Sequence, residues 1–171
     1  VFLHQHGVGT ARAVRIYKTY GEQAINLVKA NPYRLAQDIH GIGFKIADAL
    51  ALNLGIAADS PLRAQAGVMY ALQEHNANGD CAALIKDLIE TSVDLLKIPP
   101  NIIAGAIEEQ ITKKKLIRGD FAGQAGVFPS ALYEAEIGVK ERIATLLTGK
   151  TAWSNSKPER EIPWVEKQNN I

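Results

Sequence analysis

The sequence predicts a mainly α-helical protein that carries one small α+β domain. Apolar residues recur at helical spacing along most of the 171-residue chain. Glycine and proline interrupt these segments at short intervals, as they do between packed helices. One pair of short β-like runs, 116–118 and 126–128, departs from the helical pattern. With 47% hydrophobic and 22% charged residues, the chain has the balance of one globular domain or two small ones.

The first sixty residues predict four short helices joined by tight turns. The predicted helices cover 11–19, 22–30, a short segment around 35–36, and 46–54. Asn31 followed by Pro32 is a helix cap with proline at the first helical position, so the third helix begins there. Gly55 ends the fourth helix, because glycine readily adopts the left-handed conformation that terminates helices.

Residues beyond Asp59 predict longer helices and a β-ribbon. Ser60-Pro61 repeats the cap-and-proline pattern and begins a long helix that ends near Asn78-Gly79. Further helical patterns cover 84–96, 102–111 and 131–148, and a ribbon joins 116–118 to 126–128. Residues 151–171 have no periodicity, which indicates a linker. We therefore expect a module over 1–58, a helical domain with a short β-ribbon over 59–148, and a linker over 149–171.

Composition excludes several classes of protein. The net charge is +1, so neither a charge-driven nucleic-acid binder nor an acidic disordered tail is expected. The single cysteine, Cys81, excludes disulfide frameworks, indicates a reducing compartment, and is expected in the core. Neither a membrane span nor a leader sequence is expected. Aromatic residues, at 6%, argue against a stacking platform for single strands. The chain begins at Val1 and its only methionine is Met69, so we expect it to be part of a longer protein.

A repeated glycine hairpin is the most informative feature. His6-Gly7-Val8-Gly9 and His40-Gly41-Ile42-Gly43 each precede a helical segment. Two glycines around one aliphatic residue let the chain turn sharply, including positive φ angles that other residues resist. The second glycine lies where a helix begins, and the free N–H groups there form a site for a phosphate oxygen. Tight turns without a ligand would explain one copy, whereas two copies, each followed by a basic residue, favour binding to a nucleic-acid backbone.

The predicted phosphate-binding residues belong to these two hairpins. They are Gly7, Gly9, Thr10 and Arg12 in the first copy, and Gly41, Gly43 and Lys45 in the second. Val8 and Ile42 are expected to be buried plugs that hold the turns. Because phosphates carry no base-specific pattern, we expect binding without sequence preference. Residues 1–60 hold six basic and four acidic side chains, so the small positive surplus lies with the hairpins.

Both hairpins resemble the helix-hairpin-helix motif of DNA repair and replication proteins. The strings Asn31-Pro32-Tyr33-Arg34-Leu35 and Gly41-Ile42-Gly43-Phe44-Lys45, with Leu132-Tyr133-Glu134-Ala135-Glu136, resemble the N-terminal region of stand-alone RecD-like DNA helicases. These are the exodeoxyribonuclease V alpha subunit family, and the likeness covers residues 1–148. It implies a DNA-binding module in recombination and repair, a cytoplasmic location, and a 5′-to-3′ motor elsewhere in the parent chain. The motor would use ATP and magnesium, whereas no cofactor is expected here.

The second half and its basic run leave alternatives open. Helices followed by a ribbon resemble a winged helix, so we expect a tandem helix-hairpin-helix module followed by a winged-helix-like domain. Lys113, Lys114, Lys115 and Arg118 are either a second DNA contact or a solvated helix end. The whole chain is alternatively a module of another repair protein, such as a nuclease, ligase or junction binder. In a further alternative, it is a scaffold whose hairpins only pack against a motor.

No catalytic constellation is expected within the chain. Lys45 lies where glycosylases of the helix-hairpin-helix type carry a lysine nucleophile, but the matching carboxylate and a desolvated pocket are missing. Gly149-Lys150-Thr151 resembles the end of a phosphate-binding loop, yet a helix precedes it and Ala144 replaces the first glycine. The histidines lack metal-ligand spacing. We expect His6 and His40 to bond within the turns or to contact phosphate.

Overall fold

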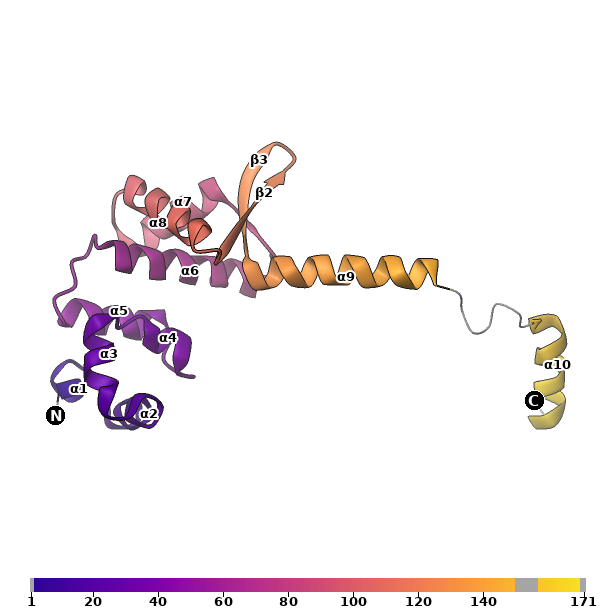
Figure 1. Ribbon diagram of the computed structural model, residues 1–171, viewed down its shortest axis with the longest axis horizontal. Helices are drawn as coiled ribbons and strands as arrows, with labels where there is room; N and C mark the ends of the chain where they lie inside the picture. Colours follow the sequence, from indigo (N-terminus) through magenta and orange to yellow (C-terminus); the bar gives the residue numbers. More distant parts are fainter. Residues whose placement is uncertain (1, 150–156, 170–171) are drawn as a thin grey trace. The chain divides into compact units, whose positions relative to one another are not determined.

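The computed structural model describes residues 2–149 and 157–169, and it confirms a mainly α-helical fold with one small antiparallel sheet (Figure 1). The contacts divide the chain after Tyr133 into a larger and a smaller compact unit. The larger unit contains both glycine hairpins and the β-ribbon. Among the helices that the structure describes, none combines the length and apolar character needed to cross a membrane.

The hairpin half of the larger unit is built from short helices. They are α1 (Phe2–Gln5), α2 (Thr10–Tyr20), a 3-10 turn (Gly21–Gln23), α3 (Ala24–Ala30), α4 (Arg34–Asp38) and α5 (Phe44–Asn53). A first hydrophobic core consists of Val8, Ile16, Ala24, Val28, Leu35, Ile39, Ile42 and Leu50. From α2 to α5, each helix contributes only one or two of these residues. Such short helices are stabilised by packing against one another rather than by their own length.

The other half of the larger unit has the element order of a winged helix. It consists of α6 (Pro61–Ala77), β1 (Ala83–Leu84), α7 (Ile85–Leu96), α8 (Pro100–Thr112), β2 (Leu116–Phe121) and β3 (Gln124–Pro129). The strands form one antiparallel sheet in the order β1-β3-β2, in which Ala83 and Arg118 both lie opposite Val127. The sequence carries no signal for β1, because two residues are too few to show alternation.

The two halves share a second hydrophobic core. Tyr33 and Phe44 of the hairpin half pack there with Ala64 of α6 and Ile103 of α8. The boundary expected after residue 58 therefore falls between two halves that pack against each other. Because α5 contributes to both cores, its position relative to α6 is set by apolar packing.

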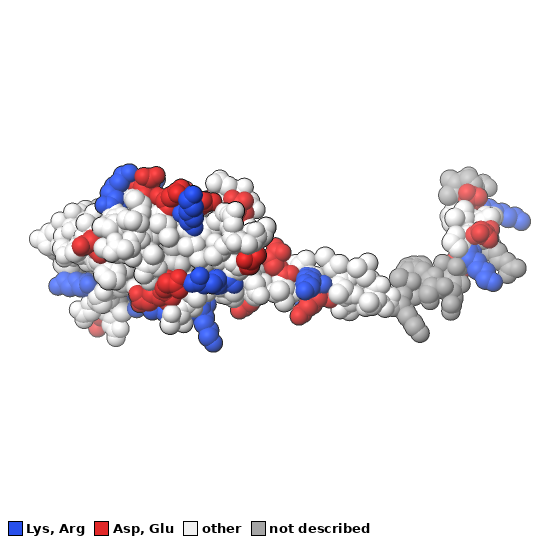
Figure 2. Space-filling view, turned by 90° about the horizontal axis from the view of Figure 1, so that it is seen from above, with Lys and Arg blue, Asp and Glu red and all other residues white. Residues whose placement is uncertain are grey.

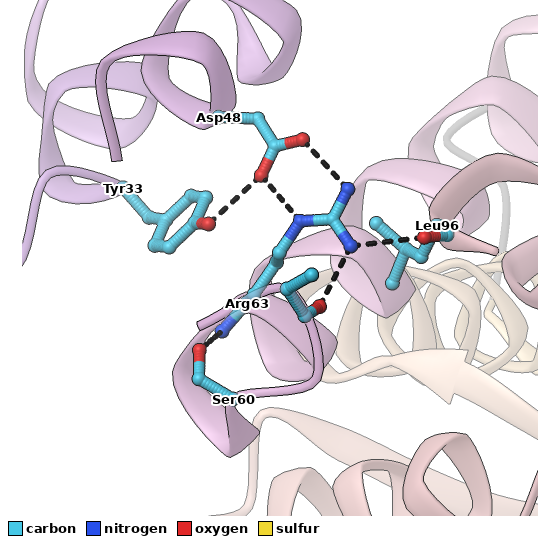
Figure 3. Close-up of polar contacts among 6 residues, drawn as sticks. Tyr33, Asp48, Ser60, Arg63 and Leu96 are labelled. Carbon is cyan, nitrogen blue, oxygen red and sulfur yellow. Dashed lines mark hydrogen bonds and ion pairs between the residues drawn. The ribbon is translucent and has the colours of Figure 1, made fainter. Parts of the chain in front are cut away.

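A buried polar network also joins α5 to α6. The Arg63 guanidinium donates to both carboxylate oxygens of Asp48, at 2.9 and 3.0 Å (Figure 3). It also donates to the carbonyl oxygens of Ala58 and Leu96, at 2.8 and 2.9 Å, while the Tyr33 hydroxyl donates to Asp48 at 2.8 Å. Arg63 is only 7% exposed. A buried charge of this kind is tolerated because it is both paired and hydrogen-bonded.

Of the two predicted helix caps, the structure confirms the one at Ser60. Ser60 has φ −63° and ψ 141°, and its hydroxyl accepts a hydrogen bond from the backbone N–H of Arg63 at 3.2 Å. At Asn31 the prediction is two residues early: α4 begins at Arg34 with Tyr33 as its cap residue, and the Asn31 side chain accepts from the N–H of Tyr33 at 3.0 Å in the turn that leads into the helix. These local bonds explain why the helix starts could be read from sequence.

The smaller unit begins within α9 (Ser130–Thr148) and includes α10 (Pro158–Asn169). None of the α9 residues is buried. The helix α10 occupies a segment for which the sequence predicts a linker without periodicity. Proline at its start, acidic residues in its first turn and Lys167 in its last turn all favour a helix. The rest of the expected linker, except 149 and 157, lies outside the described residues.

The expected burial of Cys81 is wrong. This residue is exposed, and it lies in the turn between α6 and β1. The apolar residues that follow it on the chain suggested a core position. The residues between the end of α6 and Cys81 are all exposed, with Gly79 at a positive φ, so Cys81 lies in a surface turn just before the buried Ala83.

Candidate nucleic-acid interface

The two glycine hairpins have the same backbone conformation. Gly7 and Gly41 both have φ of +84°, in the left-handed region that glycine adopts without a steric penalty. Gly9 and Gly43 both have extended backbones and cap the starts of α2 and α5, respectively. The sequence repeat is therefore also a structural repeat, with one glycine making the turn and the other beginning the helix.

Val8 and Ile42 lie between these glycines and are buried, at 4% and 2% exposed. Their backbone N–H groups donate to the carbonyl oxygens of Leu3 and Ile39, at 3.0 and 3.1 Å. The buried side chain and this hydrogen bond together hold each turn. This arrangement agrees with the predicted role of the two residues as plugs.

The glycine at each helix start leaves backbone donors open to solvent. Neither Gly9 nor Gly43 has a side chain to cap the helix, and both are exposed. The carbonyl oxygen of Gly9 accepts from the N–H groups of Arg12 and Ala13, and that of Gly43 from those of Ile46 and Ala47. The N–H groups before these have no acceptor within the helix. Together with the helix dipole they suit an anion such as a phosphate oxygen.

Each hairpin is also braced by the helix that begins at the other hairpin. The Arg15 side chain of α2 donates to the carbonyl oxygen of His40 at 3.3 Å, and the Asn53 side chain of α5 donates to that of His6 at 3.4 Å. A Cβ atom added at Gly41 would lie 2.7 Å from Nη1 of Arg15. Arg15 therefore lies directly against the second hairpin, although it is distant from it in sequence.

The predicted side-chain contacts Thr10, Arg12 and Lys45 are all exposed in the first turns of α2 and α5. The structure adds Arg15 and Lys18, which line an open recess beside the second hairpin. Sequence reasoning missed these two residues. They could have been found from their spacing: Arg12, Arg15 and Lys18 follow one another at intervals of three residues, which places all three cations along one side of α2.

An acidic group interrupts this basic surface. Asp38 lines the same recess and accepts a hydrogen bond from the Tyr20 hydroxyl at 2.7 Å. Burial of the phenol, followed by this hydrogen bond and the charge of Asp38, raises the pKa of Tyr20 to about 12. Burial also raises the pKa of Tyr33, with its bond to Asp48 as the second cause. Both tyrosines therefore remain neutral donors at physiological pH.

The basic run after α8 does not form one surface patch. Lys113 pairs with Glu109 at 2.6 Å, and Arg118 pairs with Glu108. These two cations are thus already neutralised by carboxylates of α8. Lys115 instead lines a cleft between the two halves of the larger unit. The face seen in Figure 2 accordingly shows acidic and basic side chains close together rather than one basic field.

The enzyme-like features do not form catalytic sites in the described residues. Lys45 is exposed, so it lacks the desolvated surroundings that a lysine nucleophile needs. A helix, α9, directly precedes Gly149, so the strand that a phosphate-binding loop follows is missing, and residues 150 and 151 lie outside the described residues. His6 bonds through its ring to the carbonyl oxygen of Phe2 at 2.9 Å. Within the described ranges, no three His, Cys, Asp or Glu side chains gather closely enough to hold a metal ion.

The paired hairpins define the larger unit as a tandem helix-hairpin-helix protein joined to a winged-helix-like half. Residues 1–82 match the family model described as the ATP-dependent RecD2 DNA helicase HHH domain. This part of the chain is therefore similar to the helix-hairpin-helix domain of RecD2 DNA helicases, in agreement with the resemblance inferred from the sequence over these residues. The matched range includes α6, in agreement with the core that α6 shares with α5.

Proposed function

We propose that this chain is the DNA-backbone-binding module of an ATP-dependent 5′-to-3′ DNA helicase, and that it binds DNA without sequence preference. The observation that carries the proposal is the conformational identity of the two hairpins. Each one presents an uncapped helix start, a positive-φ glycine and a nearby cation. The family match to a helicase-associated helix-hairpin-helix domain supports the same function.

Backbone amides recognise phosphates and not bases, which is the reason for expecting no sequence preference. The helix α5 begins at Gly43 of the second hairpin, and its last residue, Asn53, reaches the first hairpin. Its ten residues span about 15 Å, at about 1.5 Å per residue. A DNA strand carries a phosphate about every 3.4 Å of duplex length, so two phosphate groups of one duplex can engage both hairpins together.

The proposed function requires ATP hydrolysis, for which a helicase uses a motor domain. A phosphate-binding loop follows a strand, whereas the described residues ahead of Gly149 form the helix α9. We propose that ATP and magnesium serve a motor domain in the same parent protein. The module described here would then contribute DNA contacts to recombination or repair.

Adding serine caps to the hairpin helices tests the amide-phosphate contact directly. Gly9 and Gly43 have extended backbones like that of Ser60, and a Cβ atom at either position meets no heavy atom within 4 Å. In Gly9→Ser and Gly43→Ser, the new hydroxyl should accept from the third N–H of the helix, as Ser60 does. The substitutions should leave stability unchanged or raise it by a few tenths of a kcal/mol. They should nevertheless weaken DNA binding about tenfold for the pair, because the new side chain occupies space beside the open N–H groups of the first helical residues, where we propose that a phosphate oxygen binds.

Fluorescence anisotropy with duplexes of unrelated sequence measures the affinity, and thermal unfolding measures the stability. Gly105→Ser is the matched control, because Gly105 is exposed on α8, also meets no heavy atom within 4 Å, and lies outside the hairpins. About three or four phosphate contacts predict that log K falls with log salt concentration at a slope of about −3. A folded protein that binds no duplex at low salt would refute the proposal and favour the scaffold alternative. Equal affinity for Gly105→Ser and the hairpin variants would refute the role of the amides.

A further inference from the structure

A cleft lies between the second hairpin and the winged-helix-like half. Its volume is about 510 Å³, within the size range of small-molecule sites of about 300–1,000 Å³. One side is formed by Gly43 and Phe44 at the start of α5, and another by Tyr70 of α6. Lys115 and Ser130, at the base of the β-ribbon and the start of α9, complete it. The cleft thus begins at the same helix start that we propose binds phosphate.

The electrostatics of the cleft favour an anion. Lys115 is the one charged residue that lines it, and no carboxylate does so among the described residues. An adjoining recess of about 70 Å³ is also lined by Lys115 and by no carboxylate among the described residues. The backbone of Lys115 is fixed, since its N–H donates to the carbonyl oxygen of Gln110 and its own carbonyl oxygen accepts from Ser130, both at 3.0 Å. The positive ends of α5 and α9 add to this potential.

Aromatic rings give the cleft an apolar wall. Tyr33, Phe44 and Tyr70 all line it and form one stack, with interplanar angles of 18° and 17° between neighbours. The ring centroids are 6.0 Å apart in the first pair and 5.0 Å apart in the second. Tyr33 and Phe44 are buried, whereas Tyr70 is partly exposed. Few aromatic residues are present in the chain, yet three of them meet at this position.

The adjoining recess contains an unused hydrogen-bond acceptor. Gln110 lines it, is 3% exposed, and donates through Nε2 to Gln65 at 3.1 Å. Its Oε1 atom is buried and has no hydrogen-bond partner among the described residues. Buried acceptors without a partner are uncommon, because they lose hydration without compensation. A ligand with N–H groups, bound beside this wall, would offer the missing donor.

We propose that the cleft binds one unpaired nucleotide of the DNA strand whose backbone is held by the second hairpin. This inference rests on the proposed function, because Gly43 belongs to both the hairpin and the cleft. The phosphate lies toward Lys115 and the helix starts, and the base lies against the aromatic wall. A cation, an aromatic wall and a buried amide together match a nucleotide better than an acidic peptide or an inorganic anion. The module therefore prefers DNA with an unpaired end or fork over a blunt duplex.

The test compares a short blunt duplex with the same duplex carrying a single-stranded overhang that contains 2-aminopurine. Stacking of one base predicts about tenfold tighter binding of the overhang DNA by the full chain, with quenching of 2-aminopurine. Lys115→Gln should remove this gain, measured as the ratio of overhang to blunt-duplex affinity. Lys86→Gln is the charge-matched control, because Lys86 is exposed on α7 and does not line the cleft. Tyr70→Leu should abolish the quenching.

The outcomes separate the two proposals. If the wild-type chain binds no blunt duplex, the proposed function fails, and this inference fails with it. If it binds blunt duplex but gains nothing from an overhang, only the cleft assignment is overturned. An equal loss of overhang preference in Lys86→Gln and Lys115→Gln also overturns it. Displacement of the overhang by an equal concentration of deoxyadenosine monophosphate would show that the cleft takes a free nucleotide and not a DNA strand.

Discussion

Removing the guanidinium of Arg63 should destabilise the larger unit strongly. The Asp48 side chain is only 14% exposed. In Arg63→Met its carboxylate loses its cationic partner, and among the described residues the Tyr33 hydroxyl is the one side-chain donor that remains. The carbonyl oxygens of Ala58 and Leu96 also lose their donor. Loss of one partner from a buried ion pair costs about 3–5 kcal/mol. For a unit of this size, that loss lowers the melting temperature by about 10–20 °C.

Chemical denaturation followed by far-UV circular dichroism measures this change in the free energy of unfolding. The control is Asp94→Asn, which breaks the pair with Lys97, whose two side chains are 84% and 76% exposed. This variant should show no measurable loss, because exposed pairs are well solvated. Asp48→Leu combined with Arg63→Met should be more stable than Arg63→Met alone, since no uncompensated charge stays buried. A loss below about 1 kcal/mol in Arg63→Met, or a double variant less stable than the single one, would refute the reasoning.

Two further predictions concern packing and pH. Gly67→Ala should cost about 1–3 kcal/mol, because its Cβ would lie 2.5 Å from a side-chain atom of the buried Leu96. Gly105→Ala should instead be neutral or stabilising, because Gly105 is an exposed residue of α8 with no heavy atom within 4 Å of its added Cβ. Thermal unfolding of both variants checks this. Burial, followed by the hydrogen bond to Asp38, raises the pKa of Tyr20 from 10.0 to about 12, so the folded protein keeps the phenol neutral and loses stability as the pH rises from 10 toward 12. Stability measured across that range should therefore fall less steeply in Tyr20→Phe, and equal slopes would contradict the assignment.

Much of the fold could be predicted because its signals are local. The side-chain oxygens of Asn31 and Ser60 accept hydrogen bonds from backbone N–H groups only two and three residues later. The positive φ of Gly7 and Gly41 reflects a residue type that tolerates that conformation. In contrast, β1 exists only because Ala83 pairs with Val127, more than forty residues away. Such pairing leaves no periodicity in a two-residue strand.

The candidate nucleic-acid interface also combines features that local sequence predicts with features that depend on tertiary packing. The sequence by itself determined the two hairpins, their buried plugs and the uncapped helix starts, because these depend on glycine and on neighbouring residues. Only the tertiary structure decided that Arg15 braces the second hairpin, that Arg118 of β2 pairs with Glu108 of α8, and that Lys115 lines a cleft. The physical reason is distance along the chain. These contacts join residues whose proximity depends on how α5, α6 and the β-ribbon pack, and packing is settled by the shared core as a whole.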